Sequence, residues 1–241
     1  TSLSSTSPEF GTDGYFAKCW VREGQDIFLY KCGSDTFEVE PLSEFLATQV
    51  AEQICPEVVR YDLDFYHDRL VSKCRLFTSE QLGLVKAHDI LPQRERSISG
   101  ILRRFEELGF GDEFRRMCVL DALILNVDRH LGNFGVLVDN QTLQIQRMAP
   151  VFDHNRSLLF DMDQSQLENL PWCIGTCKPR IGTDFIATAR GMLTPEIRRD
   201  VEELREFSFR QHPEIRADQA RLDALGAVVR SQTARILELF R

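Results

Sequence analysis

The sequence has no long hydrophobic run and no excess of positive charge. No segment of its 241 residues reaches the roughly 18 apolar residues that a membrane-spanning helix requires. The first ten, TSLSSTSPEF, contain neither the basic nor the apolar region of a secretory signal. With 29 Lys and Arg against 37 Asp and Glu, the net charge of −8 argues against nucleic-acid or membrane binding driven by overall charge. We therefore expect a cytoplasmic protein that binds neither directly.

The sequence also lacks paired cysteines and internal repeats. Its seven cysteines form no C-x2-C pair and are scattered through apolar segments, which predicts reduced, mostly buried thiols. Cys173 and Cys177 form a C-x3-C without a neighbouring His or Cys pair, so a metal site there is disfavoured. With 43% hydrophobic and 27% charged residues, the chain is typical of one large domain or two packed lobes.

The predicted elements change character along the chain. YFAKCWV and DIFLYKC predict a β-hairpin, Pro41 begins a helix that Pro56 ends, and two short strands follow within residues 57–78. Residues 80–111 have a polar, helical pattern, and FRRMCVLDALILNV predicts a buried helix. FGVLV and LQIQRMAPVF predict a second hairpin, and Thr194-Pro195-Glu196 is typical of a helix start. A β-rich part therefore precedes a mainly helical one.

The segment DRHLGN, at the end of the buried helix, carries the most informative polar residues. It contains Asp128 and Asn133, and Asp153 follows twenty residues later, beyond the predicted hairpin. Phosphoryl transfer from ATP needs a carboxylate that accepts the hydroxyl proton and oxygen ligands that hold Mg²⁺ on the phosphates. The spacing predicts that the three residues lie close together and supply this set. His154 and Asn155 stand where a protein kinase has the Phe and Gly of its DFG motif.

The first part of the chain supplies candidates for phosphate binding. Lys31 lies inside the strand FLYKC, where an ammonium is costly unless it reaches negative partners, such as ATP phosphates and Glu44 of the next helix. Gly11 and Gly14 precede the first strand and would let backbone amides approach a phosphate. Two glycines in four residues also occur in many turns.

The order of these motifs resembles the HipA-type serine/threonine kinases, bacterial toxin kinases with a two-lobed, kinase-related fold. GYFAKCW, FLYKCG, EPLSEFLATQVAEQI, DALILNVDRHLGNFGVL and MAPVFD carry the resemblance, which covers most of the chain. It implies an α+β, two-lobed protein-kinase-like fold. The small β-rich N-lobe would span residues 1–78 and the larger helical C-lobe residues 79–241, with ATP between them.

The resemblance also implies a function and a role for each candidate. The chain would be an ATP- and Mg²⁺-dependent serine/threonine protein kinase that transfers the γ-phosphate to a protein hydroxyl. Lys31 would bind the ATP phosphates and pair with Glu44. Asp128 would be the catalytic base, and Asn133 and Asp153 would ligate Mg²⁺.

Further expectations rest on the resemblance alone. The hinge that holds adenine is expected at CRLF, residues 74–77, with Phe77 as a candidate. Family members autophosphorylate a serine of the glycine-rich loop, which makes Ser4, Ser5 and Ser7 candidates. They also often have an antitoxin partner, phosphorylate aminoacyl-tRNA synthetases and carry an extra N-terminal subdomain. We expect a protein substrate as one partner. A second partner would be an antitoxin or a separate polypeptide that bears the subdomain; alternatively, the subdomain is absent or was removed.

Other interpretations stay open. Phosphoinositide-type lipid kinases also have D-R-H-x-x-N followed by a magnesium-binding Asp, although this acidic chain lacks the basic run that a membrane-facing kinase needs. A catalytically inactive, nucleotide-binding pseudokinase is the third interpretation. Asp128 alone is also compatible with a loop aspartate paired with Arg129 or with a neighbouring backbone amide. For His130 we expect a hydrogen bond that organises the loop rather than a catalytic role.

Overall fold

The computed structural model describes residues 17–34 and 39–238. The candidates Gly11, Gly14, Ser4, Ser5 and Ser7 lie outside the described residues. The strands are β1 (Lys18–Glu23), β2 (Asp26–Cys32), β3 (Tyr61–Tyr66), β4 (Arg69–Arg75), β5 (Leu82–Lys86), β6 (Gly135–Asp139) and β7 (Ile145–Met148). The helices are α1 (Glu40–Ile54), α2 (Ala87–Ile90), α3 (Ile98–Glu107), α4 (Gly111–Leu123), α5 (Leu170–Thr176), α6 (Phe185–Met192), α7 (Pro195–Glu202) and α8 (Gln219–Leu237).

The first sheet has four antiparallel strands in the order β1-β2-β4-β3. The turn between β1 and β2 contains Gly24 with a φ of +60°, a left-handed conformation that glycine adopts without strain. His67 and Asp68, with φ values of 49° and 60°, form the two-residue turn between β3 and β4. The first predicted hairpin and the two short strands predicted within residues 57–78 are confirmed.

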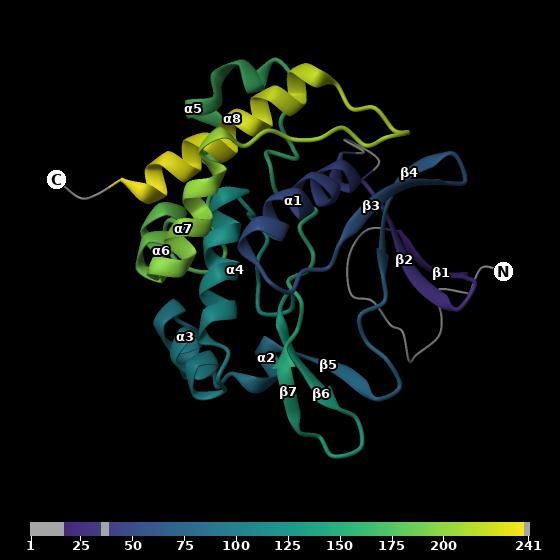
Figure 1. Ribbon diagram of the computed structural model, residues 1–241, viewed down its shortest axis with the longest axis vertical. Coiled ribbons are helices and arrows are strands. Elements are labelled where there is room, and N and C mark those ends of the chain that lie inside the picture. Colours follow the sequence, from purple (N-terminus) through teal and green to yellow (C-terminus); the bar gives the residue numbers. More distant parts are fainter. Residues whose placement is uncertain (1–16, 35–38, 239–241) are drawn as a thin grey trace.

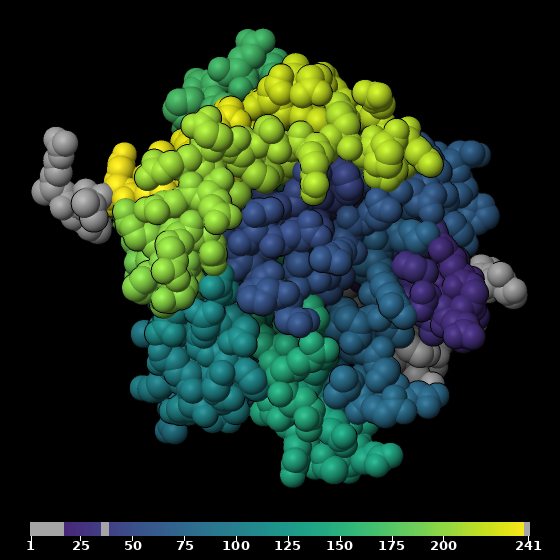
Figure 2. Space-filling model, in the orientation of Figure 1, coloured from purple at the N-terminus to yellow at the C-terminus, as the bar shows by residue number. Residues whose placement is uncertain are grey.

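Helix α1 is the central element between this sheet and the helices (Figure 1). It begins with Pro41 in its first turn, and the chain turns extended at Cys55, before Pro56. The helix packs against β3 and β4 on one side and against α4 and α7 on the other, so most of its residues are buried. In Figure 2 its outer residues fill the surface between the N-terminal strands and the C-terminal helices. Side chains of α1 can therefore contact the first sheet while the helix itself packs against the helical part of the molecule.

The second sheet has the order β5-β6-β7 and corrects one prediction. Residues 80–111 were expected to be helical, but Leu82–Lys86 is a strand, paired antiparallel with β6. The pairing depends on a partner about fifty residues further along, which the local pattern cannot reveal. A Cβ at Gly135 of β6 would lie 2.1 Å from the carbonyl oxygen of Val85, so the close approach of the strands requires glycine there.

The main hydrophobic core is continuous from α1 into the helices α3 to α8. Phe105, Phe114 and Phe134 form its aromatic centre, with ring centroids 5.3 to 5.8 Å apart. All seven cysteines carry free thiols and four are buried, as predicted. None of the described helices combines the length and apolar character needed to cross a membrane. The architecture is therefore α+β, as expected, while the lobe boundary between residues 78 and 79 stays a prediction.

Candidate active site

Lys31 of strand β2 and Glu44 of helix α1 are buried and form a cluster of charges with Asp153. Lys31 of β2 and Ser72 of β4 are opposite each other in the register, so their side chains emerge on the same face of the sheet. The Lys31 Nζ lies 2.5 Å from Oε1 of Glu44, and the Ser72 hydroxyl donates to Oε2. Nζ also lies 2.8 Å from Oδ1 of Asp153. The structure thus joins three of the residues that the sequence singled out.

Burial and opposite charge act against each other in this cluster. Burial alone would lower the pKa of Lys31, but Asp153 and Glu44 outweigh it and raise that pKa above its ordinary value. Burial raises the pKa of Glu44, and Lys31 opposes the shift. For Asp153, burial would raise the pKa, yet the charge and hydrogen bond of Lys31 lower it to about 2. Lys31 is therefore a charged ammonium, and Glu44 and Asp153 use two of its three N–H donors.

We expect Asp153 to contribute an acid-sensitive part of the stability. Its folded pKa of about 2 lies below the ordinary value of about 3.9, so this stabilisation is complete above about pH 4 and is lost as the pH falls towards the folded pKa. Between about pH 5 and about pH 3, wild type should lose about 1 kcal/mol more unfolding free energy than Asp153→Asn. Urea denaturation without nucleotide or Mg²⁺ measures this difference, and equal losses would contradict the ion pair with Lys31.

Backbone contacts fix the segment that carries Asp153 against the first sheet. Val58 and Val151 form a parallel β-bridge, and the N–H of Val59 donates to the carbonyl oxygen of Val151 at 2.9 Å. The N–H of Asp153 donates to the Tyr61 hydroxyl at 3.1 Å. The φ of Asp153 is +63°, in the left-handed region that short polar residues tolerate best. These contacts hold the backbone of Asp153, and with it the carboxylate, against the first sheet.

The DRHLGN loop has an internal hydrogen-bond network that orients its two candidates. The N–H of Asp128 donates to the side-chain oxygen of Asn126 at 3.0 Å. The side-chain nitrogen of Asn133 donates to the carbonyl oxygen of Asp128 at 3.2 Å. Because this nitrogen is engaged in the loop, the side-chain oxygen of Asn133 is the atom that can bind a cation.

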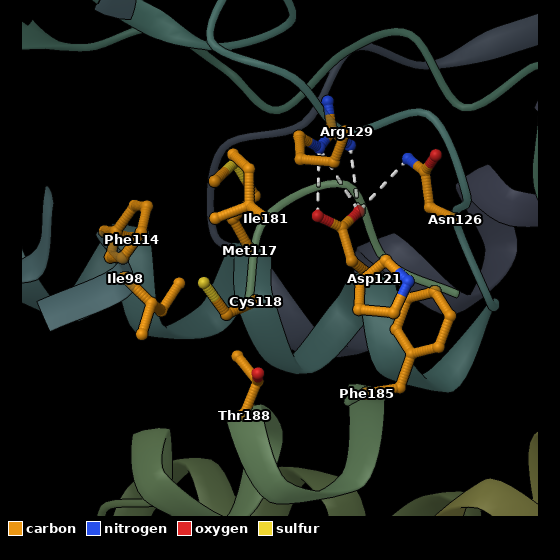
Figure 3. A pocket seen from close by; sticks show the side chains of 11 residues that line it. Ile98, Phe114, Met117, Cys118, Asp121, Asn126, Arg129, Ile181, Phe185 and Thr188 are labelled. Atoms are coloured by element: carbon orange, nitrogen blue, oxygen red, sulfur yellow. Dashed lines mark hydrogen bonds and ion pairs between the residues drawn. The ribbon is translucent and has the colours of Figure 1, made fainter. Parts of the chain in front are cut away.

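Arg129 connects this loop to the segment before the second aspartate. Its guanidinium donates to the carbonyl oxygens of Asn133 at 2.7 Å and Phe152 at 2.6 Å. Nε lies 3.0 Å from Oδ2 of Asp121 on α4. In Figure 3 the Asp121 carboxylate faces the guanidinium, and the side-chain amide of Asn126 donates to the same carboxylate. Arg129 therefore holds both halves of the candidate site together.

This role of Arg129 was not predicted from the sequence. The arginine is 3% exposed and Asp121 is 7% exposed, and such groups are rarely buried unless they are paired. An aspartate within an apolar helix, with an arginine shortly after it, was the available signal. The pairing of Asp128 with Arg129, considered as an alternative, is not present.

Asp128 instead contacts two arginines from later segments. Arg180, in the loop between α5 and α6, pairs with Oδ1, and Nε of Arg156 lies 4.0 Å from Oδ2. The Arg180 side chain is 55% exposed, and ion pairs at that exposure stabilise a protein by about 0 to 1 kcal/mol. This ion pair is therefore weak enough for a competing anionic group to draw Arg180 from the carboxylate.

The two histidines beside the candidates have structural contacts. The Nδ1 of His130 accepts the N–H of Gly132 at 3.0 Å, so the predicted loop-organising bond is confirmed. His154 is fully buried, and its Nδ1 lies 3.2 Å from the Arg129 guanidinium. Burial, followed by the charge of Arg129, lowers the pKa of His154 well below its ordinary value. His154, the residue that follows Asp153, is therefore neutral and packs in the interior.

A small apolar cluster adjoins the charged residues. Its buried members are Val59, Tyr61 and Cys74, and Leu29, Phe77 and Phe152 pack against them. Phe77 and Phe152 have ring centroids 5.5 Å apart. Phe152 directly precedes Asp153, and the Lys31 Nζ lies 5.3 Å from the Tyr61 ring centroid. The candidate adenine residue Phe77 is thus next to the segment that carries the second aspartate.

The oxygen donors present suit Mg²⁺ bound together with a nucleotide. In the described ranges, no three His, Cys, Asp or Glu side chains are grouped as a metal site. Mg²⁺ in kinase sites commonly takes one or two protein carboxylates, with phosphate oxygens and water as further ligands. A site made of Asn133 and Asp153 fits that pattern, and its binding of Mg²⁺ would depend on phosphate oxygens as further ligands.

Comparisons with known proteins find sequence similarity to one kinase over part of the chain. No protein-family model matches. The serine/threonine-protein kinase CtkA of Helicobacter pylori is 28% identical over 125 residues, which are 46% of this chain and 38% of that protein. The match therefore spans less than half of the curated relative.

Solved structures show the same fold over nearly the whole chain. The crystal structure of the proinflammatory kinase CtkA from Helicobacter pylori has a TM-score of 0.70 at 16% identity and covers 96% of this chain and 92% of its own. HipA from Shewanella oneidensis MR-1, solved with HipB and operator DNA, has a TM-score of 0.52 at 10% identity and covers 94% of this chain and 64% of the other. The predicted resemblance to HipA-type kinases and the kinase-like fold are confirmed.

Proposed function

We propose that this chain, which shares the fold of CtkA and HipA, is an ATP- and Mg²⁺-dependent kinase that phosphorylates serine or threonine hydroxyls of a protein. The contact of Lys31 with both Glu44 and Asp153 carries this proposal. It places a charged amine of the sheet beside the aspartate that follows the DRHLGN loop. Phosphoryl transfer requires this combination of cation and metal-ligand oxygens.

Each polar group has a separate task in this proposal. The third N–H of Lys31 would bind an ATP phosphate, and the apolar cluster around Phe77 would contact adenine. The side-chain oxygen of Asn133 and the carboxylate of Asp153 would hold Mg²⁺, which neutralises charge on the phosphates. Arg129 keeps these two segments at a fixed separation.

Asp128 would act on the acceptor hydroxyl. The carboxylate accepts the hydroxyl proton while the oxygen forms its bond to the γ-phosphorus. The bond from that phosphorus to the bridging oxygen of ADP breaks, ADP leaves, and the proton passes from Asp128 to water. Because Arg180 is bound to Oδ1 of Asp128, this arginine hinders the approach of the hydroxyl to that oxygen.

The likeness to HipA also supports a proposal about location and partners. That protein was solved in a toxin–antitoxin complex with HipB and operator DNA. We propose a cytoplasmic kinase with an antitoxin, or a separate N-terminal-subdomain protein, as partner. Autophosphorylation would fall on Ser5 or Ser7. Peptide mass spectrometry after incubation with ATP and Mg²⁺ tests those two serines, and no added phosphate there would refute the assignment.

Nucleotide binding tests the lysine and the metal together. Lys31→Met should weaken ATP binding in the presence of Mg²⁺ about tenfold or more, because a charge-assisted bond to phosphate is lost. Isothermal titration calorimetry measures the affinity, and circular dichroism checks the fold. The exposed Arg60→Met is the matched control and should bind like wild type. Binding that is the same for Lys31→Met and wild type, or the same with EDTA, would contradict the proposal.

A further inference from the structure

A groove of about 720 Å³ lies beside the candidate catalytic loop. Its walls are the start of α3, the DRHLGN loop, and the start of α6 with the loop before it. Its polar lining consists of Arg96, Ser97, His130, Arg180, Thr183 and Thr188. The groove is large enough for an extended peptide segment, and it is separate from the Lys31 cluster.

The lining has the opposite charge to the chain as a whole. The protein carries a net charge of −8, but the groove is lined by two arginines and by no aspartate or glutamate in the described part of the chain. Helix α3 also starts at the groove, and helix starts favour negative charge. The start of α6 already has the carboxylate of Asp184, which accepts the N–H of the lining residue Ala187 and is not itself among the lining residues. The groove therefore suits an anionic ligand.

Arg180 belongs both to this groove and to the candidate active site. It lines the groove and is paired with Asp128, which the proposed function assigns as the proton acceptor. A ligand in the groove that carries a carboxylate can therefore compete with Asp128 for the same guanidinium. Such competition links the occupancy of the groove to the state of the catalytic carboxylate.

We propose that the groove binds the acceptor segment of the protein substrate, and that an acidic side chain near the acceptor serine or threonine draws Arg180 away from Asp128. This inference rests on the proposed kinase function and adds a substrate class to it. Without an acidic residue in the acceptor, nothing competes for Arg180, which then stays on Oδ1 of Asp128 and hinders the approach of the hydroxyl. Arg180 is then a specificity-determining residue, because an acidic substrate opens the exposed ion pair that it forms with Asp128.

Peptide binding and transfer test the inference separately. Two labelled peptides of equal length carry one central serine, flanked either by glutamates or by lysines. Fluorescence anisotropy without nucleotide should show the glutamate peptide binding about tenfold more tightly, as expected for a charge-assisted contact. Arg180→Glu should abolish or invert this preference. Arg199→Glu, the same charge change on the exposed face of α7, should retain it.

The same peptides are then assayed with ATP and Mg²⁺. The glutamate peptide should have the higher kcat/KM in wild type, and Arg180→Glu should reverse the ratio, whereas general damage to the fold would lower both values alike. Equal binding of the two peptides to wild type, or an unchanged preference in Arg180→Glu, overturns the inference even if phosphate is transferred. Preferential binding of the glutamate peptide without any transfer supports the anionic groove and overturns the proposed kinase function instead.

Discussion

Replacing Asp128 by asparagine is expected to lower the rate of phosphate transfer about 10³-fold while ATP with Mg²⁺ still binds. The substitution keeps the size of the side chain but removes the proton acceptor next to the groove. The Lys31 cluster lies on other elements and keeps its contacts. Initial rates of label transfer from γ-labelled ATP, to the protein itself or to a cell extract, measure the loss.

A second carboxylate distinguishes this effect from a change in surface charge. Asp223 lies exposed on α8, outside the candidate site, and Asp223→Asn makes the same chemical change. It should transfer phosphate at the wild-type rate. If Asp128→Asn loses less than about tenfold, Asp128 is not the general base, because such groups contribute about 10² or more.

Replacing Arg129 by methionine is expected to cost about 3 to 5 kcal/mol of unfolding free energy. The substitution leaves Asp121 buried without its main partner and leaves two carbonyl oxygens, of Asn133 and Phe152, without their donor. Burial already raises the pKa of Asp121, so an unpaired carboxylate is costly there. Chemical denaturation followed by circular dichroism measures the loss.

The double variant Asp121→Leu with Arg129→Met identifies the cause. Removing both charges should restore a large part of the lost stability, since an unpaired buried charge costs more than an absent pair. Arg147→Met, which breaks an exposed pair with Glu57, should cost about 1 kcal/mol or less. A loss of that small size in Arg129→Met would contradict its role as the connection between the two segments.

Local patterns were sufficient to predict the elements that carry the candidates. Proline at the start of α1 and alternating apolar residues in β1 and β2 act over a few neighbours, so the helix with Glu44 and the strand with Lys31 were predicted. The resemblance then implied that Lys31 pairs with Glu44, and their Nζ and Oε1 atoms lie 2.5 Å apart. The assigned roles of these residues stay predictions.

Contacts between distant segments escaped the sequence analysis. Strand β5 exists because it pairs with β6, and its own residues do not distinguish a strand from a helix. Arg180 lies 52 residues from Asp128, and nothing in its loop marks it as a partner of that carboxylate. Arg129 was visible in the motif, but its task depends on the burial of Asp121 in the folded core. Side chains that hold a site together were therefore harder to predict than those that would perform its chemistry.

The most direct test of the central claim is the fate of the γ-phosphate of ATP with the wild-type chain. The protein is incubated with γ-labelled ATP, Mg²⁺ and a cell extract, in parallel with lipid vesicles that contain phosphoinositide. We expect labelled phosphoserine or phosphothreonine in protein, and this labelling should depend on Mg²⁺ and be absent with Asp128→Asn. Label that stays on ATP although the nucleotide binds, or that appears only in lipid, would contradict a protein kinase.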